Sequence, residues 1–329
     1  MDRRGYVMSG LSLFLVVPAV LLLAVFVDMT HQGGTSVATS LKSDAAFYTA
    51  KDVEEEIPNA GLEVLRNEAE KVVKTGDPIT DSESTVKADL QKEMDEKTCE
   101  YRKSTGVAVN CTILSVGPSA DPFAVEVNST VCTSKDSVTH EETLRQEISI
   151  KDAESRIPDP IPFIKCKGHG GVTNTSTRIM YGSSLESYLK SRNVSNAEAY
   201  ENATTPLFIK KCPYDPYVYH GKSENHVALK NCLENGYFHE SSDGACFLCR
   251  LEGKSTCPHY GFETFIKTRP FLNKTFSSAP CSSDHVIYND TNPEGSGTYD
   301  GNAIEYYTDG TYHFYIFLDN GHASKYGMI

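Results

Sequence analysis

The sequence has 329 residues, with 44 acidic and 31 basic side chains, a net charge of −13 and a pI near 5.2. This acidity, without a stripe of Lys and Arg, excludes nucleic acid as a partner, because phosphate binding needs clustered positive charge. The length corresponds to about two domains. The elements below predict an α+β protein: an N-terminal transmembrane helix and helical stalk, a small antiparallel sheet, and a disulfide-rich C-terminal domain with short strands and helices.

The N-terminal stretch predicts a transmembrane helix over residues 6–28. Arg3 and Arg4 stand before it, and no charged residue follows until Asp28. As a helix the segment is roughly 34 Å long, at 1.5 Å per residue. That length is enough to cross a hydrocarbon core of about 30 Å. We therefore expect residues 6–28 to contact membrane lipid.

A cleaved signal peptide is the alternative for this stretch. Signal peptides have about 7–15 apolar residues and end at a site of small residues, whereas this run is longer and ends in Val25-Phe26-Val27. A retained anchor is therefore predicted. Positive residues beside a span stay on the cytoplasmic side. Residues 1–5 are thus expected to form a cytoplasmic tip, and the C-terminal part of the chain lies outside the cell.

Residues 29–104 predict a helical stalk. After Gly33-Gly34, apolar residues recur at helical spacing over 35–57 and stop before Pro58. A second helix is expected over 62–75, with a glycine at position 76 as its C-terminal stop. The motif Thr80-Asp81-Ser82-Glu83 is typical of a capping box that begins a third helix.

Residues 105–165 predict a small antiparallel β region against which the third helix packs. Runs at 107–114, 123–127 and 144–150 are rich in strand-forming residues. Prolines at 158, 160 and 162 cannot continue a central strand, so they mark its boundary. The remaining residues, 166–329, form a Cys-rich extracellular domain. Its best helices are expected over 184–192 and 225–233, and its best hairpin over 304–318 with a turn at Asp309-Gly310.

Seven N-x-S/T sequons support export, because such a site is an acceptor for N-glycosylation in an exported chain. They lie at Asn110, Asn128, Asn174, Asn193, Asn202, Asn273 and Asn289. All of them follow residue 105. The chain is therefore predicted to be an extracellular glycoprotein.

An even number of cysteines in an exported, loop-rich chain predicts a disulfide framework. The ten cysteines are Cys99, Cys111, Cys132, Cys166, Cys212, Cys232, Cys246, Cys249, Cys257 and Cys281. A mutual bridge between Cys246 and Cys249 would close a strained two-residue loop. Each of these two is therefore expected to pair with a more distant cysteine.

A zinc site is the alternative for part of the Cys-rich tract. Close pairs of Cys with further Cys or His nearby are typical of tetrahedral zinc ligation. The alternative ligands are His239, Cys246, Cys249, Cys257 and His259. Free or redox-active thiols are a third interpretation. In a domain exported to the outside of the cell, disulfides are favoured over zinc. We therefore expect no cofactor, and zinc is the alternative.

Two parts of the sequence resemble known proteins. Arg3-Arg4-Gly5-Tyr6 before a long apolar helix, and the Pro-Asp-Pro turn at 158–160, are similar to archaeal type IV pilin-like membrane proteins. The resemblance covers about the first 165 residues and implies an N-terminal helix in a membrane or filament core, an exposed globule, and other surface or pilus subunits as partners. The chain departs from the family at Gly10, where pilins usually carry Glu. The tract 244–253 resembles uncharacterised proteins of methane-producing archaea, whose anaerobic habitat would disfavour disulfides.

No enzyme signature is complete. Gly253-Lys254-Ser255 resembles the end of a phosphate-binding loop, but Leu248 stands where its first glycine is needed. No G-x-S-x-G motif occurs. The predicted function is therefore non-catalytic, with no catalytic residue named: a membrane-anchored, pilin-like surface glycoprotein for adhesion or cell-envelope assembly. The alternatives are a membrane-tethered zinc-dependent hydrolase and a carbohydrate-binding surface receptor.

Overall fold

The computed structural model combines helices and small antiparallel sheets, as the α+β prediction expects. It describes residues 3–194, 196–221, 226–268, 281–289, 302–308 and 313–329. The chain divides into two compact units. The first consists of Met1–Glu54, Glu96–Cys111 and Val131–Glu142, and the second of Glu55–Asp95, Thr112–Thr130 and Thr143–Ile329.

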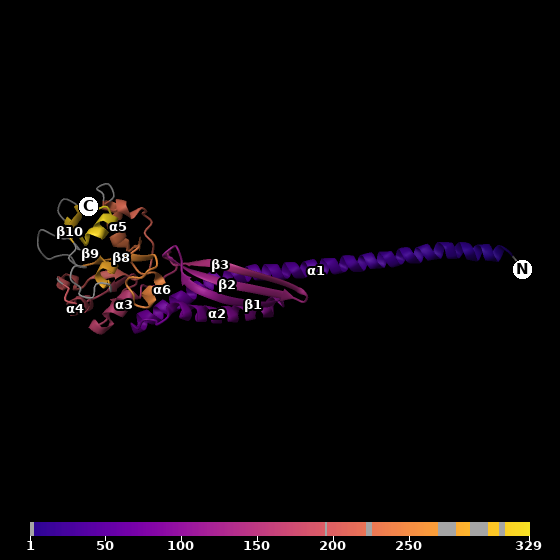
Figure 1. Cartoon of the computed structure of the whole chain (residues 1–329), viewed down its shortest axis with the longest axis horizontal. Coiled ribbons are helices and arrows are strands. Elements are labelled where there is room, and N and C mark those ends of the chain that lie inside the picture. The colour runs from indigo at the N-terminus through magenta and orange to yellow at the C-terminus, as the bar shows by residue number, and fades with distance from the viewer. Residues whose placement is uncertain (1–2, 195, 222–225, 269–280, 290–301, 309–312) are drawn as a thin grey trace. The chain divides into compact units, whose positions relative to one another are not determined.

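Helix α1 (Arg3–Thr75) is uninterrupted, as Figure 1 shows. The breaks predicted at Gly33-Gly34 and before Pro58 are therefore wrong. Around the proline, Ile57 and Ala60 are fully buried, so the apolar face continues past it and packing offsets the lost hydrogen bond. The helix ends where expected: the residue that follows it, Gly76, has φ +69° and donates to the carbonyl of Val72 at 2.7 Å.

We expect Pro58→Ala to raise the free energy of unfolding by about 1–3 kcal/mol, because alanine restores the missing N–H donor and removes the ring from the preceding turn. Pro78→Ala is the matched control, since Pro78 lies between helices and outside either one. It should leave stability nearly unchanged. Chemical denaturation of both variants measures the difference. A Pro58→Ala midpoint at or below that of the wild type would contradict the expectation.

The N-terminal half of α1 is the one apolar helix of the described chain that is long enough to cross a membrane, by length and composition. Its most apolar 18-residue window has a mean hydropathy of 2.1 and is not buried. Phe14, for example, is 82 % exposed. A core helix of the same composition would be covered by protein, so this segment needs an apolar environment from elsewhere.

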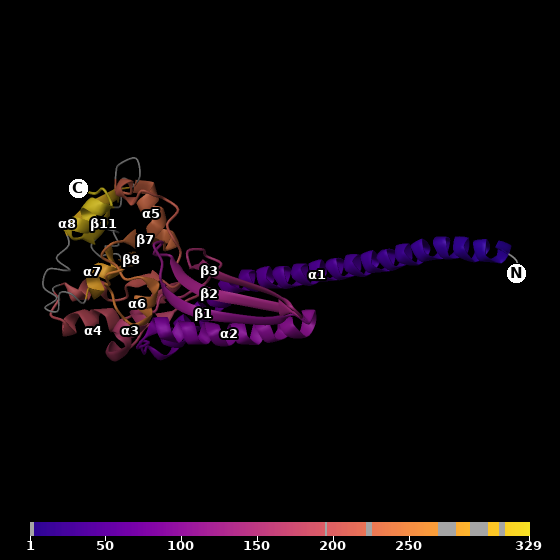
Figure 2. The same ribbon diagram turned by 45° about the vertical axis from the view of Figure 1, so that its right-hand side comes forward.

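Helix α2 (Ser82–Thr105) runs beside β1 (Ala108–Pro118) in both views (Figures 1 and 2). In the second unit, Gln91 accepts a hydrogen bond from the backbone of β1 at 2.7 Å. The predicted helix start is confirmed, but Asp81 caps it: its carboxylate accepts from the Ser84 N–H at 3.0 Å. This bond lowers the pKa of Asp81.

The predicted antiparallel region forms a three-stranded sheet in the order β1-β2-β3. The strands β2 (Ala124–Lys135) and β3 (Val138–Ser149) are longer than the sequence pattern indicates. In the first unit, buried Thr133 of β2 donates to the carbonyl of Ala46 in α1 at 2.8 Å. In the second unit, the chain leaves the sheet at Ile150, whose N–H donates to the Phe123 carbonyl at 2.8 Å.

The Cys-rich part of the second unit holds short elements only. Its helices are α3 (Ile161–Cys166), α4 (Ser184–Ser191), α5 (His226–Asn235), α6 (Phe247–Leu251), α7 (Asp284–Tyr288) and α8 (Asn320–Lys325), with 3-10 turns at Lys167–His169, Ala197–Tyr200 and Tyr217–Tyr219. Its strands are β4 (Thr173–Asn174), β5 (Arg178–Met180), β6 (Thr204–Pro206), β7 (Phe238–Ser241), β8 (Gly261–Lys267), β9 (Cys281–Ser283), β10 (Asn302–Thr308) and β11 (His313–Leu318). The two expected helices and the expected hairpin are present as α4, α5 and β10–β11.

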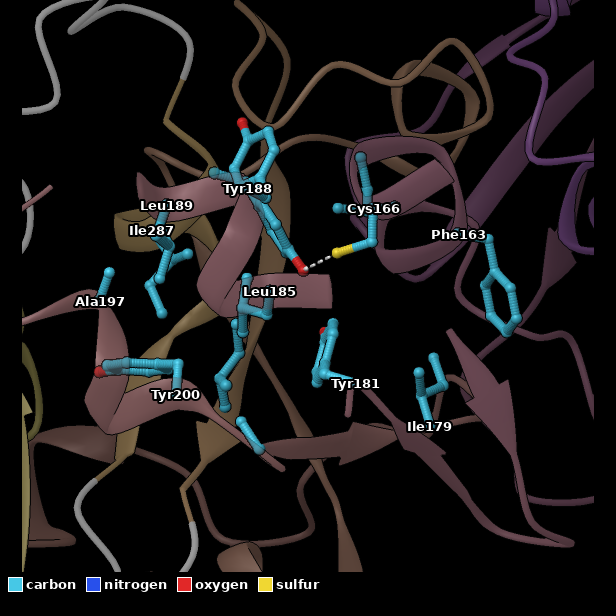
Figure 3. Close-up of a cluster of buried hydrophobic side chains, with 14 of the residues drawn as sticks. Phe163, Cys166, Ile179, Tyr181, Leu185, Tyr188, Leu189, Ala197, Tyr200 and Ile287 are labelled. Atoms are coloured by element: carbon cyan, nitrogen blue, oxygen red, sulfur yellow. Dashed lines mark hydrogen bonds between the residues drawn. The ribbon is translucent and has the colours of Figure 1, made fainter. Parts of the chain in front are cut away.

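One sheet has the order β4-β5-β6-β8-β7, and β9 also pairs with β8. The hairpin β10–β11 is separate, and its predicted turn lies outside the described residues. A buried cluster gathers side chains from α3, β5 and α4 (Figure 3). Within it, the Cys166 thiol lies 3.8 Å from the Tyr288 hydroxyl, and burial raises the pKa of Cys166 to about 11. This cysteine is therefore a protonated core residue.

Candidate metal centres

Four residues from two loops, α5 and β7 form the first candidate centre, which we call the Cys2His2 set: Cys212, His220, Cys232 and His239. The backbone of Cys212 is held on β7, because its N–H donates to the Phe238 carbonyl at 2.8 Å. His220 follows a 3-10 turn, Cys232 lies in α5, and His239 lies in β7. The four side chains therefore come together only when these parts of the chain pack against one another.

The two histidine–sulfur distances in the Cys2His2 set match those of a tetrahedral zinc site, whereas the sulfurs lie closer together than two zinc ligands would. Zinc–sulfur and zinc–nitrogen bonds of about 2.3 and 2.0–2.1 Å place ligand atoms roughly 3.3–3.8 Å apart. Here Nε2 of His220 lies 3.4 Å from both the Cys212 and the Cys232 sulfur, and the sulfurs are 3.1 Å apart. All four ligand atoms lie within 4.8 Å of one another. A disulfide needs about 2.05 Å between sulfurs, so the two thiols are not bridged.

Within the Cys2His2 set, His239 has the most apolar surroundings. The residue is fully buried, yet neither ring nitrogen has a hydrogen-bond partner within the described chain. The rings of Tyr217, Phe265 and Tyr326 surround it, with centroids 4.7–5.3 Å away. A buried imidazole without a partner is costly in free energy. A metal ion coordinated by one of its nitrogens satisfies that need.

The two thiols of this set differ in pKa: the hydrogen bond with Cys212, together with burial, raises the pKa of Cys232. The hydrogen bond from the Cys232 thiol, helped by neighbouring histidines, lowers the pKa of Cys212 despite burial. Burial lowers the pKa of His239, which keeps its imidazole neutral. Thiolate and neutral imidazole are the forms that bind zinc.

The second centre, the Cys3His set, comes from one short segment: Cys246, Cys249, Cys257 and His259. The N-terminus of α6 carries the first two. The Nδ1 atom of His259 lies 3.6 Å from the Cys246 sulfur and 3.7 Å from the Cys249 sulfur. The Cys257 sulfur accepts a hydrogen bond from the Cys246 N–H at 3.3 Å. Thiol donors from Cys246 and then Cys249 lower the pKa of Cys257. This geometry also fits tetrahedral zinc.

A buried ion-pair network holds α6 in place. Arg250, which follows Cys249 in α6, donates to both carboxylate oxygens of Asp159 at 3.0 and 2.6 Å. It also bonds Asp284 in α7 and the Phe262 carbonyl in β8. All three charged side chains are at most 2 % exposed. The Pro-Asp-Pro turn at 158–160 thus supplies the carboxylate that orients the helix of the Cys3His set.

The disulfide framework is not supported by the structure. No disulfide joins any of the ten cysteines, all of which lie in the described residues: Cys99, Cys111, Cys132, Cys166, Cys212, Cys232, Cys246, Cys249, Cys257 and Cys281. Five of the cysteines, at positions 212, 232, 246, 249 and 257, belong to the two sets. A sixth, Cys166, lies beside Tyr288 in the buried cluster. Histidines are members of both sets.

The structure divides the alternative zinc ligands between the two sets. Cys246, Cys249, Cys257 and His259 come together, but His239 belongs to the Cys2His2 set. Sequence reasoning missed Cys212, His220 and Cys232 as ligands. Their spacing, Cys-x7-His-x11-Cys-x6-His, alternates the two ligand types and is the signal that was available.

The predicted glycosylation sites are spread over several elements. Asn110, Asn174, Asn193 and Asn202 are exposed, as an acceptor must be, and Asn128 and Asn289 are half-buried. Asn128 bonds Ser115 and Glu126 through its amide. Asn273 lies outside the described residues.

The two sets rest on geometry within this chain. Each has four protein ligands of the kinds that zinc prefers, in one compact unit. Comparisons of the chain with protein-family models, with curated proteins and with solved structures found no match.

Proposed function

We propose that this chain is a single-pass membrane protein that presents, outside the cell, a domain stabilised by two structural zinc ions. It acts as a non-catalytic component of the cell surface, in adhesion or envelope assembly. The observation that carries this proposal is that both sets supply four protein ligands. Zinc in a catalytic site keeps a position for water or substrate, whereas a structural site is closed by protein.

The anchor supports the cell-surface part of the proposal. The exposed apolar stretch of α1 needs lipid or other apolar helices around it. Arg3 and Arg4 precede it, which favours a cytoplasmic N-terminus. A long helix with an exposed apolar start is also the arrangement that the pilin-like resemblance implies. Four exposed sequons are compatible with an extracellular glycoprotein.

We expect a tag after Ile329 to be digested when protease is added to intact cells, while a tag before Met1 is protected. The reason is the charge asymmetry across residues 6–28. Immunoblotting of both tagged chains measures this, and permeabilised cells are the control in which both tags are lost. Protection of the C-terminal tag with loss of the N-terminal one would contradict the proposed topology.

A further inference from the structure

A third group of ligand-type side chains lies in the second unit and shares no member with either zinc set. Asp243 follows β7, His285 lies in α7 and His322 lies in α8. Each offers one ligand atom, and the three atoms lie within 4.8 Å of one another. Asp243 is exposed, whereas His285 and His322 are 5 % and 6 % exposed.

Within this group, His285 has a ring nitrogen that could coordinate a cation. Its Nδ1 atom is buried and has no hydrogen-bond partner in the described ranges. Its ring centroid lies 5.4 Å from that of His322. Burial lowers the pKa of His285, which leaves a neutral ring with a lone pair to offer. A buried nitrogen left unpaired costs free energy that a bound cation would recover.

His322 is held on both sides by carboxylates. Its Nδ1 lies 3.0 Å from Asp319, and its Nε2 lies 3.0 Å from Glu263. Glu263 is in turn bonded by Lys325 and Tyr326. A metal-binding histidine commonly donates its other N–H to a carboxylate, which orients the ring. Burial alone would lower the pKa of His322, but the hydrogen bonds with Asp319 and Glu263 raise it to about 10. Metal binding at either nitrogen therefore displaces a proton and breaks one of these two hydrogen bonds, while the other nitrogen still donates to its carboxylate.

A cavity of about 570 Å³ adjoins the group. Asp243 and His285 line it, and so does Cys257 of the Cys3His set, so the cavity lies beside that set although the two groups share no ligand. Three protein ligands leave a position open on a tetrahedral ion, as in catalytic zinc sites. We propose that Asp243, His285 and His322 form a third metal site, which takes an exchangeable divalent cation such as Zn²⁺ and keeps a coordination position for water or an oxygen ligand in this cavity.

This site differs chemically from the two zinc sets because it has no sulfur ligand. Thiolates hold zinc more firmly than a carboxylate and two imidazoles do, and a missing fourth ligand weakens binding further. The third ion should therefore leave first under mild chelation. Cobalt(II) bound there should lack the thiolate-to-metal charge-transfer absorption that a cysteine ligand produces. These two properties separate the third site from the others in one experiment.

The test uses the full chain in detergent, loaded with zinc and then treated with a mild chelator. Cobalt(II) is titrated in while bound zinc is measured by elemental analysis. We expect one cobalt per chain, with ligand-field bands but no thiolate charge transfer, and zinc held at two. His285→Ala should abolish this binding, and Asp243→Asn should weaken it at least tenfold. His31→Ala, which removes an exposed histidine of α1, should bind cobalt like the wild type.

Two results would overturn the third site: no cobalt bound beyond the two zinc ions, or equal cobalt binding by the wild type, His285→Ala and Asp243→Asn. Cobalt that shows thiolate charge transfer has replaced zinc in a Cys-containing set, and it counts against the site as well. Because Asp243 is exposed, its variant decides the question if His285→Ala does not fold. A zinc content below two ions per chain would contradict the two proposed structural zinc sites, whether or not cobalt binds at the third site.

Discussion

Replacement of Cys232 by serine should reduce the zinc content from two ions to one per chain and unfold the Cys-rich part of the second unit. The Cys2His2 set joins β7, α5 and two loops, and the variant would leave buried His239 without a ligand. Structural zinc contributes about 10–16 kcal/mol in zinc-finger peptides. That exceeds or equals the whole stability of a typical domain, about 5–15 kcal/mol. Elemental analysis and thermal unfolding followed by circular dichroism measure the two effects.

Two further variants make the zinc prediction specific. Cys249→Ser should remove the other ion, because it breaks the Cys3His set. Cys99→Ser is the matched control, since Cys99 is exposed and belongs to neither set. It should keep both ions and the wild-type melting temperature. A wild-type protein without metal, whose cysteines resist alkylation until reduced, would instead restore the disulfide interpretation.

Arg250→Met should lower the free energy of unfolding by about 3–5 kcal/mol, the usual cost of leaving buried charges without their partner. The change removes the cation that pairs with Asp159 and Asp284, and both carboxylates are buried. Methionine has a similar length, so the loss comes mainly from charge. Equilibrium denaturation of the full chain measures it. Because Arg250 also orients α6, we expect the variant to bind metal more weakly at the Cys3His set.

Matched variants separate this network from ordinary ion pairs. Arg145→Met breaks an exposed pair with Glu126 and should cost at most about 1 kcal/mol. Adding Asp159→Asn and Asp284→Asn to Arg250→Met should recover part of the loss, because amides are neutral. If Arg250→Met were no more destabilising than Arg145→Met, the buried network would not support α6 as described.

The helical and β elements show how far local sequence patterns reach. Strand-rich runs and helical periodicity predicted the three-stranded sheet, α4, α5 and the β10–β11 hairpin, since each pattern reports which side chains face a core. The same reasoning failed at Pro58. A proline disfavours a helix locally, but α1 keeps Ile57 and Ala60 buried on either side of it. Tertiary packing therefore outweighed a local signal.

The sequence by itself determined the membrane-length apolar segment and the compact Cys3His set, because both are encoded within short stretches of chain. Cys246 to His259 spans one turn, one short helix and one loop. Only the tertiary structure decided the Cys2His2 set. Its ligands come from two loops, α5 and β7, and His239 could join it only after β7 had packed beside Cys212 and α5. Side chains far apart in sequence become ligands of one ion when burial brings them together, and spacing alone does not show which ones will meet.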